Sequence, residues 1–119
     1  MTEANPYPSD WLRGVLSLAV RRLLLDGPTY GYAIAVGLEE QGFGKVKGGT
    51  LYPLLARLEE AGHVTTTWQA GDGGPGRKFY NLTLEGRAAF ALEAKDWAEF
   101  ADRVTSFITH TQHTHGGTP

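Results

Sequence analysis

The 119-residue sequence contains no cysteine. This absence excludes disulfide bonds, thiolate metal ligands and cysteine nucleophiles, and nothing indicates an oxidising compartment. Long hydrophobic runs are also missing, because Arg21 and Arg22 interrupt the most apolar stretch. The N-terminus, MTEANPYPSD, lacks the basic and apolar regions of a secretory leader. We therefore expect a cytoplasmic protein that is neither secreted nor inserted in a membrane.

Sequence signatures of an active site are absent as well. Serine, histidine and carboxylate residues occur, but they form no nucleophile elbow, phosphate-binding loop or cluster with metal-ligand spacing. His110, His113 and His115 lie in a polar tail without neighbouring carboxylates, so a solvated tail explains them better than a metal site. We predict a protein that is not an enzyme and that binds no cofactor or metal ion.

The formal net charge of −2 argues weakly against a nucleic-acid-binding protein. Its distribution along the chain argues the other way. Residues 1–44 and 83–119 each carry a net charge of −2, whereas residues 45–82 carry +2. The central segment is therefore the candidate for contact with a polyanion.

A helix is expected over residues 11–25, where apolar side chains cover more than one face. Either Ser9 or Asp10 provides its N-cap, because both side chains accept hydrogen bonds from the first turn. Asp26, Gly27 and Pro28 end it, since proline cannot continue a helix.

A second helix is expected over residues 30–41, with Thr29 as its N-cap. Two interior glycines, Gly31 and Gly37, each cost about 1 kcal/mol relative to alanine, so close packing is expected to hold them there. The positions expected to face the core are Tyr32, Ile34, Ala35 and Leu38.

A third helix follows, and its apolar residues fall at i, i+3, i+4 and i+7: Leu51, Leu54, Leu55 and Leu58. The opposite face carries Tyr52, Pro53, Ala56 and Arg57. Thr50 as N-cap places Pro53 in the first turn, where proline needs no hydrogen-bond partner. A helix that begins near Gly48 instead has to accommodate Pro53 by a slight kink. A helix with an apolar back and a polar, aromatic front suits a DNA groove.

The next segment is expected to form a hairpin. Residues 64–68 alternate and are rich in β-branched side chains, residues 70–76 are a glycine-rich loop, and residues 78–82 return as a strand. Three helices followed by a hairpin give a mainly helical fold with a small β-hairpin, the winged helix-turn-helix, over residues 11–82. Residues 1–10 are expected to be flexible.

Thr83 is the expected N-cap of a last helix over residues 84–109, within a predicted dimerisation segment over residues 83–109. Such a helix is about 39 Å long, which is more than a domain of this size can cover. We therefore expect a homodimer, followed by a disordered tail over residues 110–119. The residues assigned to the dimer interface are Trp11, Leu12, Phe90, Trp97, Phe100, Ala101, Val104, Phe107 and Ile108.

Three motifs in this order resemble the PadR family of transcriptional regulators: TYGYAI at 29–34, GGTLYPLLARLEEAGHV at 48–64 and GRKFYNLTLEGR at 76–87. The resemblance implies a winged-helix domain with a C-terminal dimerisation helix. It also implies binding to double-stranded DNA, in many members as a repressor on a palindromic operator. The single C-terminal helix is similar to the smaller subclass, and Lys47-Gly48 departs from the common pattern.

The resemblance further implies that the helix with Thr50, Tyr52 and Pro53 is the recognition helix and that Arg77 and Lys78 belong to the wing. Basic residues on either side of this helix and on its front complete the candidate surface. The full predicted DNA-binding set is Lys45, Lys47, Gly49, Thr50, Tyr52, Pro53, Arg57, Arg77 and Lys78.

Trp97 has two interpretations. It matches a tryptophan that stacks on planar ligands in multidrug-binding members of the family, which implies a small aromatic effector held by Val15 and Trp97. Alternatively, Trp97 only fills space in a dimer core, the commoner role of an aromatic on a heptad face. A different class also stays open for the whole chain, because winged helices can be protein interaction modules that do not bind DNA.

Overall fold

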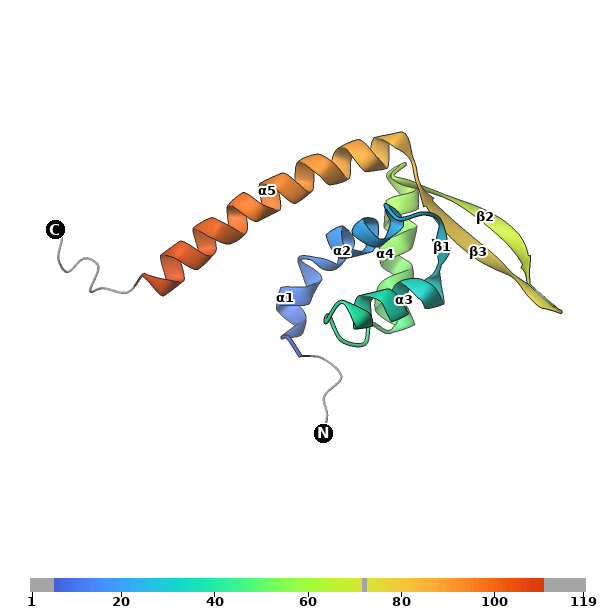
Figure 1. The fold of residues 1–119 in the computed structure, drawn as a ribbon, viewed down its shortest axis with the longest axis horizontal. Coiled ribbons are helices and arrows are strands. Elements are labelled where there is room, and N and C mark those ends of the chain that lie inside the picture. Colours follow the sequence, from blue (N-terminus) through green and yellow to red (C-terminus); the bar gives the residue numbers. More distant parts are fainter. Residues whose placement is uncertain (1–5, 72, 111–119) are drawn as a thin grey trace.

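The computed structural model describes residues 6–71 and 73–110 (Figure 1). The elements follow the order α1 (Ser9–Arg13), α2 (Leu16–Leu24), β1 (Thr29–Tyr30), α3 (Gly31–Glu40), α4 (Gly48–Glu60), β2 (Val64–Gly71), β3 (Gly74–Leu82) and α5 (Leu84–Thr109). The mainly helical winged-helix class is confirmed. The predicted disordered tail beyond His110 and half of the predicted flexible N-terminus, residues 1–5, fall outside the described residues, as do His113 and His115.

The expected first helix is wrong as a single element, because α1 and α2 are separated at Gly14 and Val15. The Gly14 and Val15 N–H groups donate to Trp11 and Leu12 at 3.3 and 2.9 Å, which tightens the last turn of α1. Glycine favours such an interruption because it has a low helix propensity. The predicted cap is also wrong: Pro8 is the N-cap residue, and no side chain caps α1.

The expected hairpin belongs to a three-stranded antiparallel sheet in the order β1-β3-β2. Thr29 does not cap α3 but lies in β1, opposite Tyr80, and Tyr30 is the residue that precedes the helix. The strands of the hairpin also extend through most of the predicted loop, to Gly71 and from Gly74. The sheet is therefore larger than the sequence indicates.

Helix α4 begins at Gly48 and not after Thr50. The Lys47 carbonyl accepts hydrogen bonds from the N–H groups of Thr50 and Leu51, both at 2.9 Å. Pro53 is consequently inside the helix. Its ring nitrogen cannot donate to the carbonyl of Gly49, so one helical hydrogen bond is missing at this point.

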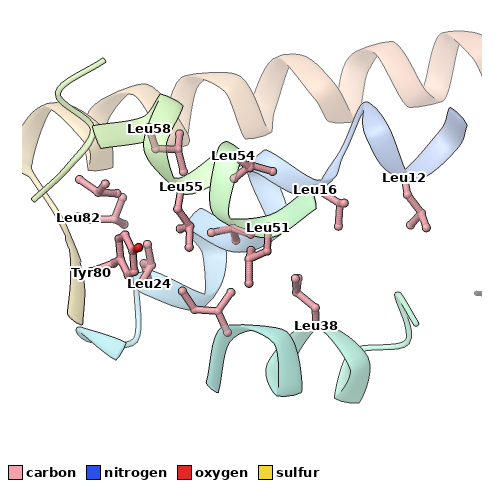
Figure 2. Close-up of a cluster of buried hydrophobic side chains, with 13 residues drawn as sticks. Leu12, Leu16, Leu24, Leu38, Leu51, Leu54, Leu55, Leu58, Tyr80 and Leu82 are labelled. Carbon is pink, nitrogen blue, oxygen red and sulfur yellow. The ribbon is translucent and has the colours of Figure 1, made fainter. Parts of the chain in front are cut away.

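The core lies between α2, α3, α4 and the sheet (Figure 2). All four predicted leucines of α4 are buried in it, which confirms the amphipathic pattern of this helix. Tyr32 was expected to face the core, but it is 70% exposed, whereas Ile34 and Leu38 are fully buried.

Helix α5 begins where predicted, because the Thr83 side chain accepts a hydrogen bond from the Gly86 N–H at 2.9 Å. The same hydroxyl donates to the Gly62 carbonyl at 2.7 Å and so joins the start of α5 to the end of α4. From there α5 runs along α2 and then past the rest of the chain (Figure 1). No helix within residues 6–71 and 73–110 has the length and hydropathy of a membrane span.

Candidate nucleic-acid interface

The face of α4 opposite its buried leucines is exposed to solvent. Tyr52 is 50% exposed, and Pro53 and Arg57 are exposed. Lys45, Lys47, Gly49 and Thr50, at or before the start of the helix, are exposed as well. All predicted DNA-binding residues of α4 therefore lie at the surface, and most of them belong to the N-terminal half of the helix.

A groove beside Tyr52 brings together three segments that are distant in sequence: the start of α3, the front of α4 and the wing formed by β2 and β3. Aromatic and basic side chains dominate its walls. Its lining residues are Tyr30, Gly31, Tyr32, Tyr52, Trp68, Arg77, Lys78 and Tyr80. Such a combination can stack on sugars or bases and can also attract phosphates.

Arg77 and Lys78, the basic residues predicted for the wing, differ in their surroundings. The Arg77 guanidinium lies 4.5 Å from the centre of the Tyr30 ring, so a cation–π contact holds it at the groove. Lys78 Nζ lies 4.0 Å from a carboxylate oxygen of Glu59, which offsets part of its charge. Arg77 is therefore the stronger candidate for a phosphate contact.

Glu59 connects α4 to the wing through two contacts of its carboxylate. Besides its contact with Lys78, its carboxylate accepts a hydrogen bond from the Thr66 hydroxyl at 3.2 Å. Burial, and to a lesser degree the nearby Tyr52 and Glu59, raises the pKa of Tyr80 above its usual value. Tyr80 is therefore a neutral side chain at the base of the groove at physiological pH.

Five groove residues were missed in the sequence-based assignment: Tyr30, Gly31, Tyr32, Trp68 and Tyr80. Tyr30 and Tyr32 reach the groove because β1 pairs with β3, and Trp68 faces it from β2 with 71% of its surface exposed. The only local signal was the presence of large aromatic side chains near basic ones. Their convergence depends on strand pairing between residues about 50 positions apart, Thr29 and Tyr80 among them.

Arg57 lies apart from this groove. It lines a separate hollow between α2, α4 and α5, together with Ser17, Arg21 and Glu93. Lys45 is also engaged within the chain, since its Nζ lies 3.5 Å from a Glu39 carboxylate oxygen. The DNA-binding assignment of these two residues stays a prediction, as it does for the rest of the predicted set.

A second candidate surface lies on α5. Helical periodicity places Trp97, Phe100, Val104, Phe107 and Ile108 toward one side of the helix, and Phe107 reaches 82% exposure. Phe90 and Ala101 are half-buried, and Trp11 on α1 is exposed. Leu12 differs from the other residues assigned to a dimer interface, because it is only 8% exposed and packs in the core of its own chain. The exposed set on α5 is Leu84, Leu92, Trp97, Phe100, Val104, Phe107 and Ile108.

An ion pair between the buried Arg21 and the half-exposed Glu93 joins this helix to the rest of the chain. Arg21 Nη2 donates to Glu93 Oε1 at 2.7 Å, and the Arg21 side chain is only 4% exposed. Arg21 also donates to the carbonyl and hydroxyl oxygens of Ser17, both at 3.1 Å. Its Nη1 is buried and has no hydrogen-bond partner among the described residues. Glu93 is thus the main compensation for a buried positive charge.

The two residues assigned to a ligand, Val15 and Trp97, line the same shallow hollow between α2 and α5. Leu18, Phe90 and Ala94 complete much of its apolar wall. In the part of the chain that the structure describes, no group of three metal-ligating side chains lies close enough together to hold a metal ion.

An exposed helix front, a basic wing and a long additional helix define a winged-helix protein of the DNA-binding regulator class. Residues 20–92 match the model of the transcriptional regulator PadR-like family. The chain belongs to this family, whose members are regulators of transcription and not enzymes.

Individual relatives agree with this assignment. A transcriptional regulator of Mycobacterium tuberculosis is 30% identical over 102 residues, which cover 86% of this chain and 94% of the relative. The crystal structure of a PadR family transcriptional regulator from Eggerthella lenta superposes with a TM-score of 0.78 at 31% identity, covering 87% of this chain and 89% of the other. A transcriptional regulator from Clostridium thermocellum gives a TM-score of 0.73 at 26% identity, with 84% and 99% covered.

Proposed function

We propose that the chain is a homodimeric repressor that binds a palindromic operator through α4 and the wing. The observation that carries the proposal is the orientation of α4. Four buried leucines fix its back in the core, so that Tyr52 and the exposed residues at its start face outward next to Arg77. In winged-helix proteins a helix presented in this way enters the major groove.

The proposal assigns different tasks to residues 11–82 and residues 83–109. The first segment reads DNA, and α5 pairs with the α5 of a second copy through its exposed apolar side. A two-fold dimer presents the same surface twice, which matches a palindromic sequence. The two recognition helices then reach successive major grooves, about 34 to 36 Å apart.

A planar hydrophobic effector is proposed to release the operator. Val15 and Trp97 support this part of the proposal because they line one apolar hollow next to the proposed dimer helix. A ligand that prefers a dimer with another spacing between the recognition helices lowers operator affinity by shifting a two-state equilibrium. Titration of a variant that carries Trp11→Phe and Trp68→Phe, so that Trp97 is the one tryptophan left, with flat cationic aromatic compounds tests it. Quenching of the emission supports a site, and unchanged emission at saturation refutes it.

A gel shift with the DNA upstream of the chain's own gene tests the central part. The intact protein should bind at low salt, Tyr52→Ala and Arg77→Ala should weaken binding, and Arg57→Ala tests the assignment of that residue. Arg13→Ala is a matched control, since Arg13 is exposed on α1 and, within the described part of the chain, pairs only with Asp10. Absence of a shift with the intact protein would refute the proposal and favour an interaction module that binds another protein.

A further inference from the structure

Gly31, the first residue of α3, faces the ring of Tyr52 on α4. A Cβ atom built on Gly31 would overlap the Tyr52 hydroxyl and would lie 2.7 Å from Cζ and 2.8 Å from Cε1. Both distances are shorter than Cβ atoms tolerate. The ring of Tyr52 therefore occupies the space that any other residue at position 31 would need for its side chain.

The opposite edge of the ring rests on Gly48, one turn earlier in α4. A Cβ on Gly48 would lie 3.4 and 3.5 Å from Cδ2 and Cε2 of Tyr52, which is ordinary van der Waals contact. The ring thus lies between two glycines, but only Gly31 is incompatible with a side chain. This difference identifies Gly31 as the residue that determines where the ring can lie.

The backbone does not explain the glycine at position 31. Within residues 6–71 and 73–110 the glycines with positive φ are Gly27, Gly42, Gly44, Gly62 and Gly73, so Gly31 adopts a conformation that alanine tolerates. Alanine also has the higher helix propensity. Moreover, the overlapping atoms are the far end of a flexible side chain, which can move without a shift of the backbone. Alanine at position 31 should therefore displace Tyr52 and leave the fold intact.

The position of the Tyr52 hydroxyl matters because it is free to bind DNA. It makes no hydrogen bond to any residue within ranges 6–71 and 73–110, and it lies in the groove with Arg77. A tyrosine hydroxyl in such a place can donate to a phosphate or contact a base edge. We propose that Gly31 is a positioning residue for operator binding, which acts by leaving the space that holds Tyr52 against α3. The proposal rests on the proposed function of the groove.

A double-mutant cycle tests the proposal with the full chain: the intact protein, Gly31→Ala, Tyr52→Ala and the double variant. Operator affinity is measured by fluorescence anisotropy and stability by thermal unfolding. Gly31→Ala should weaken binding roughly tenfold, the loss typical of one misplaced hydrogen bond to a charged group, with a nearly unchanged unfolding midpoint. In the Tyr52→Ala background the same substitution should cause no further loss, because the ring it displaces is gone.

Each other outcome is decisive. Unchanged affinity of Gly31→Ala overturns the inference and leaves the proposed function standing. An equal loss in both backgrounds also overturns it, because Gly31 would then act independently of Tyr52. No binding by the intact protein at low salt removes the proposed function, and the inference with it.

Discussion

Helices α4 and α5 differ in where their apolar side chains lie. Helix α4 buries Leu51, Leu54, Leu55 and Leu58 in the core of its own chain. Helix α5, with 26 residues, contributes no large hydrophobic side chain to the core of the described residues and instead exposes aromatic rings such as Phe100 and Phe107. The comparison teaches that a regular apolar pattern predicts a helix with a packed side but does not say which molecule covers that side.

The largest expected effect lies on the α4 side of this comparison. Leu55 is fully buried, so Leu55→Ala should lower the free energy of unfolding by about 2 to 5 kcal/mol through lost contacts and a cavity. Leu84→Ala on α5 is the control, because Leu84 is 84% exposed. Chemical denaturation measures both. Similar losses in the two variants would contradict the distinction between the helices.

The next prediction concerns the α5 side. Phe100→Ala should leave the fold of the single chain intact but weaken dimerisation about a hundredfold, because both copies lose an apolar ring from the proposed interface. Leu92→Ala is the control, because Leu92 is 63% exposed and does not belong to the residues assigned to the dimer interface. Sedimentation at several concentrations measures the change. An unchanged dissociation constant for Phe100→Ala would assign dimerisation to another surface.

A smaller effect is expected where α5 contacts α2. Glu93→Gln removes the charge that compensates the buried Arg21 and should cost about 1 to 3 kcal/mol of stability. Glu99→Gln, which disturbs only an exposed pair with Lys95, should cost less than about 0.5 kcal/mol. Thermal unfolding distinguishes them. Equal small losses would mean that the Arg21–Glu93 pair contributes little to the free energy of unfolding.

The smallest effect is expected at Tyr80, beneath the groove. Because its pKa is raised in the folded state, the folded protein keeps a proton that the unfolded chain loses near pH 10. Its contribution to stability is therefore complete below that pH and declines as the pH rises above it. Tyr80→Phe should remove part of this alkaline loss, as seen in denaturation curves between neutral and alkaline pH. An identical pH profile in the variant would refute the assignment to Tyr80.

Much of this architecture could be predicted from local patterns. The spacing of four leucines predicted the buried face of α4, and Thr83 predicted the start of α5, because both depend on neighbours within a few residues along the chain. Local patterns failed where contacts between residues distant in sequence determine the secondary structure. Thr29 resembles a helix cap, but pairing with Tyr80 places it in a strand.

The candidate site shows the same limit. The spacing of the leucines identified the buried face of α4, and the opposite face was therefore expected to be exposed. Tyr52 was predicted as a surface residue for this reason. The groove around it was not, because Tyr30, Tyr32 and Trp68 gather there only when β1 and β2 pair with β3. The role inferred for Gly31 likewise depends on a contact between α3 and α4 that no local pattern indicates.

The central claim is that α5 assembles two copies so that two α4 helices bind one operator. The mass of the complex between the full chain and the operator duplex, measured by light scattering after size-exclusion chromatography, tests it most directly. The account predicts two chains per duplex, and a lower occupancy for Phe100→Ala at the same protein concentration. A stable complex with one chain per duplex would contradict it.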